Sequence, residues 1–149
     1  MHIRSLATSA IIASLVGVLS ASAAVSPHPA KISRDDTSGK IFERSDMIEI
    51  DHGDHMTLDV TTFMNKAGTF ASGMYKSSAV RFEINEPYGV DEFMYFLEGS
   101  VTLTSTDGTV QVINAGEGVT IGSDWTGIWE TEGYTKIWVI YSEDGSGLQ

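Results

Sequence analysis

The chain has 149 residues, of which 20 are Asp or Glu and nine are Lys or Arg, so its formal net charge is −11, and it contains no cysteine. Such an acidic protein repels phosphate backbones and anionic lipid surfaces, which argues against nucleic acids and membrane surfaces as partners. The lack of cysteine excludes both a disulfide and a lipidated cysteine anchor.

The first residues have the features of a secretory signal peptide. Arg4 precedes an apolar run over residues 6–19, and the small residues from Ala21 to Ala24 suit signal peptidase. The run is short for a membrane span, although an uncleaved anchor is the alternative. We therefore expect residues 1–24 to be removed and the mature protein to be periplasmic or secreted, without insertion into the membrane.

Segments of different composition follow. Residues 25–55 are polar and contain Pro27 and Pro29, which predicts an N-terminal arm or linker in which only Ile41 and Phe42 could dock on a core. Residues 56–143 consist of short apolar and β-branched runs between turn signals, the pattern of an antiparallel all-β domain. Residues 144–149 are expected to form a flexible tail.

The all-β domain is expected to contain a series of short strands. They cover residues 57–64, 73–76, 79–84, 92–97, 100–105, 109–113, 118–121, 126–131 and 134–141. The dipeptides Glu98-Gly99, Asp107-Gly108 and Glu132-Gly133 place Gly where tight hairpins need a positive φ. Strands with this spacing predict a double-sheet jelly roll or a small barrel.

Two parts of this domain resemble the paired motifs of the cupin superfamily. Residues 92–99, a glutamate followed by an apolar strand and a Leu-Glu-Gly turn, resemble the end of the first motif. Residues 116–122 resemble the opening of the second motif and residues 127–130 its close. Trp129 and the last strand, residues 136–141, resemble the branch named for (S)-ureidoglycine aminohydrolase. The resemblance implies a single-domain cupin, which is a double-stranded β-helix or jelly-roll barrel, and by analogy a homodimer.

The positions that usually bind metal in this family differ here. Glu86, Tyr88 and Gly127 stand where the resemblance implies histidines, and only the motif glutamate, Glu92, matches. Glu86 and Glu92 could hold a hard cation such as Mn or Mg through oxygen ligands. Without imidazoles a tight Zn, Fe or Ni site is not expected, so no cofactor is predicted. Residues 51–55 offer two histidines and two aspartates, either as a second metal site or as a solvated turn.

Glu92 is the candidate catalytic residue. Strand alternation places Glu92, Met94 and Phe96 on one face. If this face lines the barrel, Glu92 is an interior carboxylate suited to proton transfer. The alternative is a structural ion pair with a basic side chain such as Arg81 or Lys76.

Other candidate ligand-binding residues lie elsewhere in the predicted all-β domain. Arg81 and Glu83 share a face, where they would hold a carboxylate or ureido group or form an ordinary surface ion pair. Tyr75, Tyr88 and Trp129 could line an aromatic pocket or pack in the core.

These residues support one function and two alternatives. We expect an exported cupin that binds a small polar organic molecule and is not a conventional histidine-ligated metalloenzyme; the resemblance suggests an amide, ureido or amino-acid-like ligand. The first alternative is a hydrolase or lyase of the ureidoglycine aminohydrolase type that uses Glu92 and Glu86 with a divalent cation. The second is a structural or interaction module with an apolar barrel and Glu92 directed outward.

Overall fold

The structure, a computed structural model, describes residues 28–148. The predicted signal peptide, residues 1–24, lies outside the described residues. The helices are α1 (Arg34–Thr37) and the 3-10 helices η1 (Lys40–Glu43) and η2 (Ser146–Leu148). The strands are β1 (Ile48–Asp51), β2 (Met56–Met64), β3 (Phe70–Ile84), β4 (Asp91–Ser105), β5 (Val110–Asn114), β6 (Gly118–Ile121) and β7 (Gly127–Tyr141). None of the described helices is long and apolar enough to cross a membrane.

The strands of the described chain form one antiparallel sheet, which confirms the predicted all-β fold. They lie in the order β1-β2-β3-β7-β4-β5, and β6 also pairs with β4. β6 and β5 share one edge of β4, because β6 pairs with its first half and β5 with its second half. The predicted turn at Asp107-Gly108 joins β4 to β5. β4 therefore contacts β7 along one edge and two short strands along the other.

Three strands, β3, β4 and β7, each have 15 residues, whereas the sequence predicts two shorter strands in place of each. The hairpin turns predicted at Glu98-Gly99 and Glu132-Gly133 are wrong, because both dipeptides lie within a continuous strand. Gly99 and Gly133 have φ values of 70° and 123°, and the pairing of β4 with β7 shifts register on either side of Gly99. The glycines bend the strands instead of reversing the chain.

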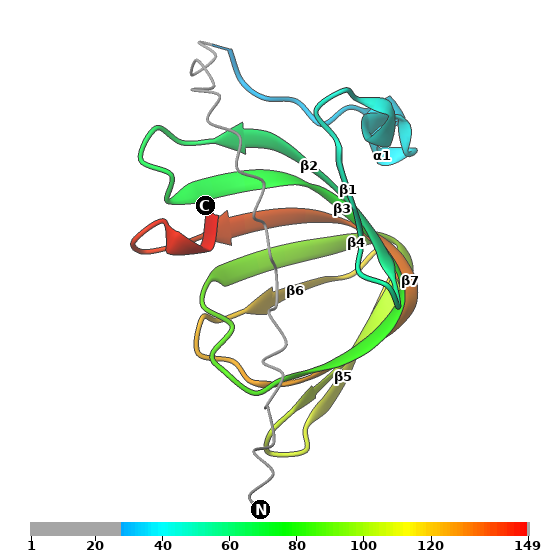
Figure 1. Ribbon diagram of the computed structural model, residues 1–149, viewed down its shortest axis with the longest axis vertical. Helices are drawn as coiled ribbons and strands as arrows, with labels where there is room; N and C mark the ends of the chain where they lie inside the picture. Colours follow the sequence, from blue (N-terminus) through cyan, green and yellow to red (C-terminus); the bar gives the residue numbers. More distant parts are fainter. Residues whose placement is uncertain (1–27, 149) are drawn as a thin grey trace, which may run out of the picture.

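The bends curl the sheet so that one face encloses the interior of the domain (Figure 1). Burial along β4 confirms the predicted face: Glu92, Met94 and Phe96 are buried, whereas Phe93 and Tyr95 are exposed. The inner face carries two apolar clusters. One contains Ile84, Met94, Phe96, Val101, Leu103, Ile113, Ile121, Trp129 and Tyr134. The other contains Ala71, Val90, Trp138, Ile140 and Leu148.

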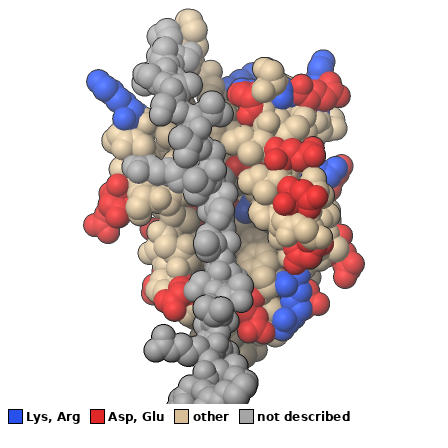
Figure 2. Space-filling view, viewed as in Figure 1, with Lys and Arg blue, Asp and Glu red and all other residues tan. Residues whose placement is uncertain are grey.

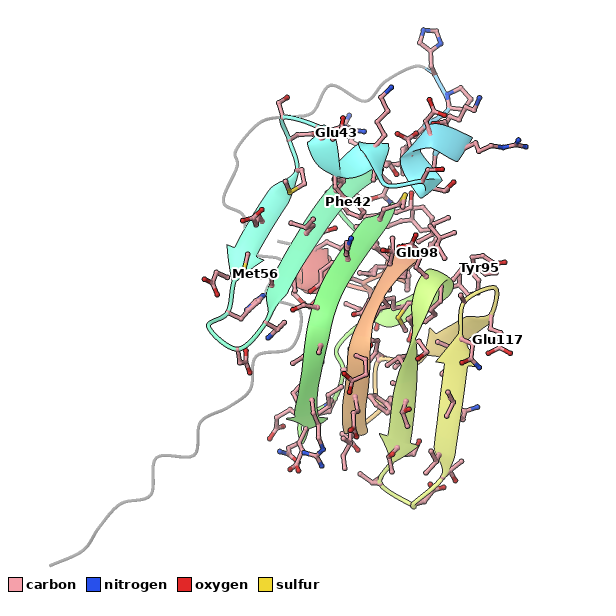
Figure 3. The ribbon with its side chains drawn as sticks, turned by 90° about the vertical axis from the view of Figure 1, so that its right-hand side faces the viewer. Phe42, Glu43, Met56, Tyr95, Glu98 and Glu117 are labelled. Carbon is pink, nitrogen blue, oxygen red and sulfur yellow. The ribbon has the colours of Figure 1, made fainter. Side chains whose placement is uncertain are left out.

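The segment predicted as an arm contains folded elements, α1, η1 and β1. β1 pairs with β2 as an edge strand, although the polar composition of this segment predicts no strand. Ile41 of η1 is buried against Val60 and Met74 on the outer face of the sheet, as expected for a docking residue. Figure 3 shows η1, with Phe42, beside one end of the sheet near β2 and β3. The outer face of this part of the sheet is therefore covered by the chain itself.

We expect Gly99→Ala to destabilise the fold. A Cβ at this position would lie 2.0 Å from Gly133 O, and the φ of 70° is itself unfavourable for alanine. Gly116→Ala is the matched control, because Gly116 has a φ of 87° and its added Cβ would meet no described atom within 4 Å. Denaturant unfolding should give a loss of about 1 kcal/mol for the control and of roughly 2–4 kcal/mol for Gly99→Ala. Equal losses would show that the strand crossing is loosely packed.

Candidate functional site

A buried ion pair lies on the inner face of the sheet. Lys136 Nζ of β7 is 2.7 Å from Glu92 Oε1 of β4, and the two residues are only 5% and 3% exposed. Alternation places Lys136 inward, because it shares its face of β7 with the buried residues Tyr134 and Trp138. Lys136 Nζ also lies 3.0 Å from Met94 Sδ. The pair links β4 to β7 inside the barrel.

The second carboxylate oxygen of Glu92 accepts a hydrogen bond from the Tyr88 hydroxyl. Tyr88 lies in the loop between β3 and β4, and its backbone N donates to Trp125 O at 3.0 Å. Burial and the negative charge of Glu92 raise the pKa of Tyr88 well above its ordinary value, so the hydroxyl remains a donor. Both oxygens of Glu92 are thus bound by protein donors.

Aromatic rings surround the Lys136 ammonium. Its Nζ lies 5.4 Å from the ring centre of Trp129, 5.5 Å from that of Tyr75 and 5.8 Å from that of Tyr134. These distances allow cation–π attraction. Phe82 stacks on Trp129 at 6.0 Å. Burial raises the pKa of Tyr75 to about 12 and that of Tyr134 well above its ordinary value, so both hydroxyls stay protonated.

Asp59 of β2 is a third buried ionisable group. Its Oδ1 accepts a hydrogen bond of 3.1 Å from Trp138 Nε1, whereas its Oδ2 has no partner among the described residues. Burial raises the pKa of Asp59 to about 6, although the Trp138 hydrogen bond and the Lys136 charge oppose this rise. Trp129 Nε1 is also buried without a partner within residues 28–148. We use the name interior cluster for Asp59, Tyr75, Tyr88, Glu92, Trp129, Tyr134 and Lys136.

The interior cluster is bordered by both apolar clusters of the inner face, and Tyr75 and Tyr88 pack against each of them. Tyr75, Phe82 and Tyr88 are only partly buried although they pack on the inner face. Solvent therefore reaches the rim of the interior cluster, while its charged groups are covered.

A separate shallow depression lies between β5 and β6. It is lined by Gln111, Val112, Ile113, Glu117, Gly118 and Val119. Glu117 supplies its charge and already accepts a hydrogen bond of 2.7 Å from Asn114 N. The depression thus offers fewer polar groups for ligand recognition than the interior cluster.

The structure brings only part of the predicted site residues together. The interior cluster includes the predicted residues Tyr75, Tyr88, Glu92 and Trp129. Arg81 and Glu83 have side chains that are 51% and 55% exposed, and they form a surface ion pair with a distance of 3.5 Å. Glu86 is exposed in the loop between β3 and β4. These positions of Arg81, Glu83 and Glu86 give no support to a role in binding a ligand inside the barrel.

Glu92 does form the ion pair with a basic side chain that was the alternative interpretation, but its partner is Lys136 and not Arg81 or Lys76. Lys136 could have been identified from the sequence. It stands in the last apolar strand, and alternation over residues 134–140 places it on the same face as large apolar side chains.

The sequence carries no comparable indication that Asp59 is buried. Thr57 and Thr61 share its face of β2, so the pattern is that of a solvated face. Asp59 is buried because the sheet curls and brings this face against Trp138.

The predicted cation-binding residues do not fit a metal site. Glu86 is exposed, and the two oxygens of Glu92 are bound by Lys136 and Tyr88. Within residues 28–148, no group of three or more His, Cys, Asp or Glu side chains could hold a metal ion. This includes the β1–β2 turn at residues 51–55, where the two histidine rings stack at 4.3 Å.

Residues 64–136 match the family described as EutQ-like cupin domain. The EutQ protein of Clostridium difficile has a similar fold, with a TM-score of 0.54 and 19% identity over 67% of this chain and 79% of that one. Ectoine synthase from P. lautus gives a TM-score of 0.54 with 14% identity over 68% of this chain and 72% of that one.

A protein of unknown function of the DUF861 family from Pseudomonas syringae pv. tomato gives a TM-score of 0.57 with 18% identity. The alignment covers 63% of this chain and 43% of that protein, so the chain spans less than half of its length. The chain matches no curated protein in sequence. At these identities the similarity shows the fold alone, and the relation to the ureidoglycine aminohydrolase branch stays a prediction.

We expect Asp59→Asn to change the pH dependence of stability. The carboxyl pKa is raised from 3.8 to about 6 by folding, so the folded protein holds this proton more tightly than the unfolded chain does. The stabilisation from Asp59 is complete below pH 3.8 and is lost as the pH rises through about 6, a loss of about 3 kcal/mol. In denaturant unfolding, the wild type should lose stability relative to the variant over this window. A constant difference between the two proteins would place the carboxyl in solvent.

Proposed function

Because the chain carries a single cupin domain, we propose that it binds a small polar organic molecule inside its barrel. The interior cluster supplies the polar contacts, and Tyr75, Phe82 and Tyr88 supply aromatic surface at its partly open rim. The sequence resemblance suggests an amide, ureido or amino-acid-like ligand. The observation that carries the proposal is the buried pair of Lys136 and Glu92.

A buried ion pair is a poor way to stabilise a barrel of this size. Removing two charges from water costs several kcal/mol per ion, and apolar side chains of similar volume often stabilise a core at least as well. A small domain also depends on apolar packing for most of its stability. Recognition of a polar ligand therefore explains Lys136 and Glu92 among aromatic rings better than stability does.

The two alternative functions have less support. The hydrolase or lyase hypothesis uses Glu92 and Glu86 with a cation, but Glu86 is exposed and Glu92 is bound by Lys136 and Tyr88. The hypothesis of a structural module expects Glu92 to point outward from an apolar barrel, whereas Glu92 is buried on the inner face. The homodimer suggested by family analogy stays a prediction.

We expect a thermal-shift screen of amides, ureido compounds and amino acids to find a ligand that raises the unfolding midpoint of the wild type. The double variant Lys136→Met/Glu92→Gln should bind this ligand at least about tenfold more weakly in calorimetry. It removes both charges together, because either single change leaves an unpaired buried charge that costs roughly 3–5 kcal/mol of stability.

The control for this experiment is Arg81→Gln/Glu83→Gln, which removes a charge pair of the same signs from the protein surface. We expect this variant to bind the ligand as the wild type does. Unchanged affinity in the interior double variant, or a matching loss in the surface variant, would contradict a site at Lys136 and Glu92.

We also propose that the protein is exported, on the basis of the signal-peptide features of residues 1–24. The full chain expressed in a Gram-negative host should be recovered from the periplasm or the medium, with an N-terminus near residue 25 in intact-mass spectrometry. A chain that starts at residue 25 is the control and should stay in the cytoplasm. Recovery of uncleaved full chain in the cytoplasm would refute export.

A further inference from the structure

Two buried polar atoms of the interior cluster lack a partner within residues 28–148. Asp59 Oδ2 is a hydrogen-bond acceptor, and Trp129 Nε1 is a donor. Buried polar atoms are nearly always hydrogen-bonded, and one left alone costs about 1–3 kcal/mol. An unpaired acceptor and an unpaired donor in one interior therefore indicate complementary groups on a bound molecule.

Both atoms belong to residues that flank the same ammonium group. The Trp129 ring centre lies 5.4 Å from Lys136 Nζ, and Asp59 is paired in the sheet with Tyr75, which is paired in turn with Lys136. Trp138 Nε1 holds Asp59 Oδ1 at 3.1 Å, which fixes the carboxylate in place and leaves Oδ2 available. A molecule that contacts both atoms would therefore bind beside Lys136.

The charge balance of the interior decides whether the bound molecule carries a positive or a negative charge. Lys136 is paired with Glu92 at 2.7 Å, whereas Asp59 forms no salt bridge among the described residues. With Asp59 ionised, the interior carries one uncompensated negative charge. Aromatic rings line the same space, and their faces also attract cations.

The charge of the whole protein also favours a positively charged ligand. The chain carries a formal net charge of −11, and Figure 2 shows Asp and Glu side chains along both sides of one face of the molecule. Such a field attracts small cations and repels small anions. A free carboxylate on the ligand would be repelled both by this field and by the interior.

We propose that the ligand is a small amino amide, with a protonated primary amine that binds Asp59 Oδ2 and a carbonyl oxygen that accepts from Trp129 Nε1. This assignment rests on the proposed function and narrows its ligand class to compounds with a net positive charge. The ammonium supplies the counter-charge that Asp59 lacks, and the carbonyl supplies the acceptor that Trp129 lacks.

Glycinamide and propionamide form the test pair. They have the same size and the same amide group, and they differ by an ammonium in place of a methyl group. In calorimetry with the wild-type protein, glycinamide should bind at least about tenfold more tightly than propionamide. Because this comparison needs no variant, it does not depend on whether a mutant folds.

Variants then assign the two contacts. Asp59→Asn should remove the preference for glycinamide, and Asp124→Asn, which removes the same charge from an exposed loop, should leave it unchanged. Trp129→Phe should weaken both amides, because it removes the donor and keeps an aromatic ring. Near pH 6, glycinamide should also release protons on binding, since the bound ammonium lowers the raised pKa of Asp59.

The outcomes separate this inference from the proposed function. Equal affinity for the two amides, or a preference that persists in Asp59→Asn, overturns the ammonium contact. If another polar compound still binds and its affinity depends on Lys136 and Glu92, the proposed function stands without this ligand class. If no compound of the screen or of the test pair binds the wild type, both are overturned.

Discussion

The pairing of Lys136 with Glu92 is the constraint on which the interior of this protein depends. Each charge can be buried only because the other is present at 2.7 Å. Tyr88 adds a hydrogen bond to the second oxygen of Glu92, so the pair also fixes the loop between β3 and β4. The aromatic rings around Lys136 exclude water while they tolerate the cation. The result is a polar centre held in place from three parts of the chain.

The curl of the sheet is what makes this centre an interior. Lys136 and Glu92 lie on the neighbouring strands β7 and β4, and Asp59 lies two strands away from Lys136, on β2. In a flat sheet the side chain of Asp59 would face solvent. The bends at Gly99 and Gly133 allow β4 and β7 to cross closely, and the inner face closes over itself. The backbone freedom of two glycines is thus linked to the burial of a distant carboxylate.

Alternation along single strands was sufficient to predict a good part of this arrangement. It groups Glu92, Met94 and Phe96 on one face, which is the buried face in the structure, and the turn chemistry of Asp107-Gly108 identifies a real hairpin. The pattern cannot distinguish a turn from a bend, because both use a glycine with a positive φ. For this reason the sequence predicts a hairpin at Glu98-Gly99, although β4 continues through this dipeptide.

The candidate site shows more clearly what the residue pattern along a strand cannot predict. Residue type makes Trp129 and Tyr75 candidates for an aromatic pocket or for core packing, and the structure places both of them at the Lys136 ammonium. Arg81 and Glu83 satisfied the same pattern on one strand, yet they lie on the exposed side. Alternation already separates Arg81 and Glu83 from the apolar residues Phe82 and Ile84, but which side chains meet inside the barrel depends on how neighbouring strands pair and bend. Asp59 is the extreme case, since its burial is a property of the curled sheet alone.

Where the cupin resemblance implies histidines, this chain has Glu86, Tyr88 and Gly127, which changes what the interior can do for a bound molecule. A resident metal ion offers a positive charge together with exchangeable coordination positions. Lys136 also offers a positive charge, but it is covalently fixed, has only donors, and is already bound by Glu92. What remains for a ligand is the unpaired acceptor of Asp59, the unpaired donor of Trp129 and the aromatic rings. These groups can hold and orient a molecule, and the Asp59 carboxylate, whose pKa burial raises to about 6, can also accept a proton from it.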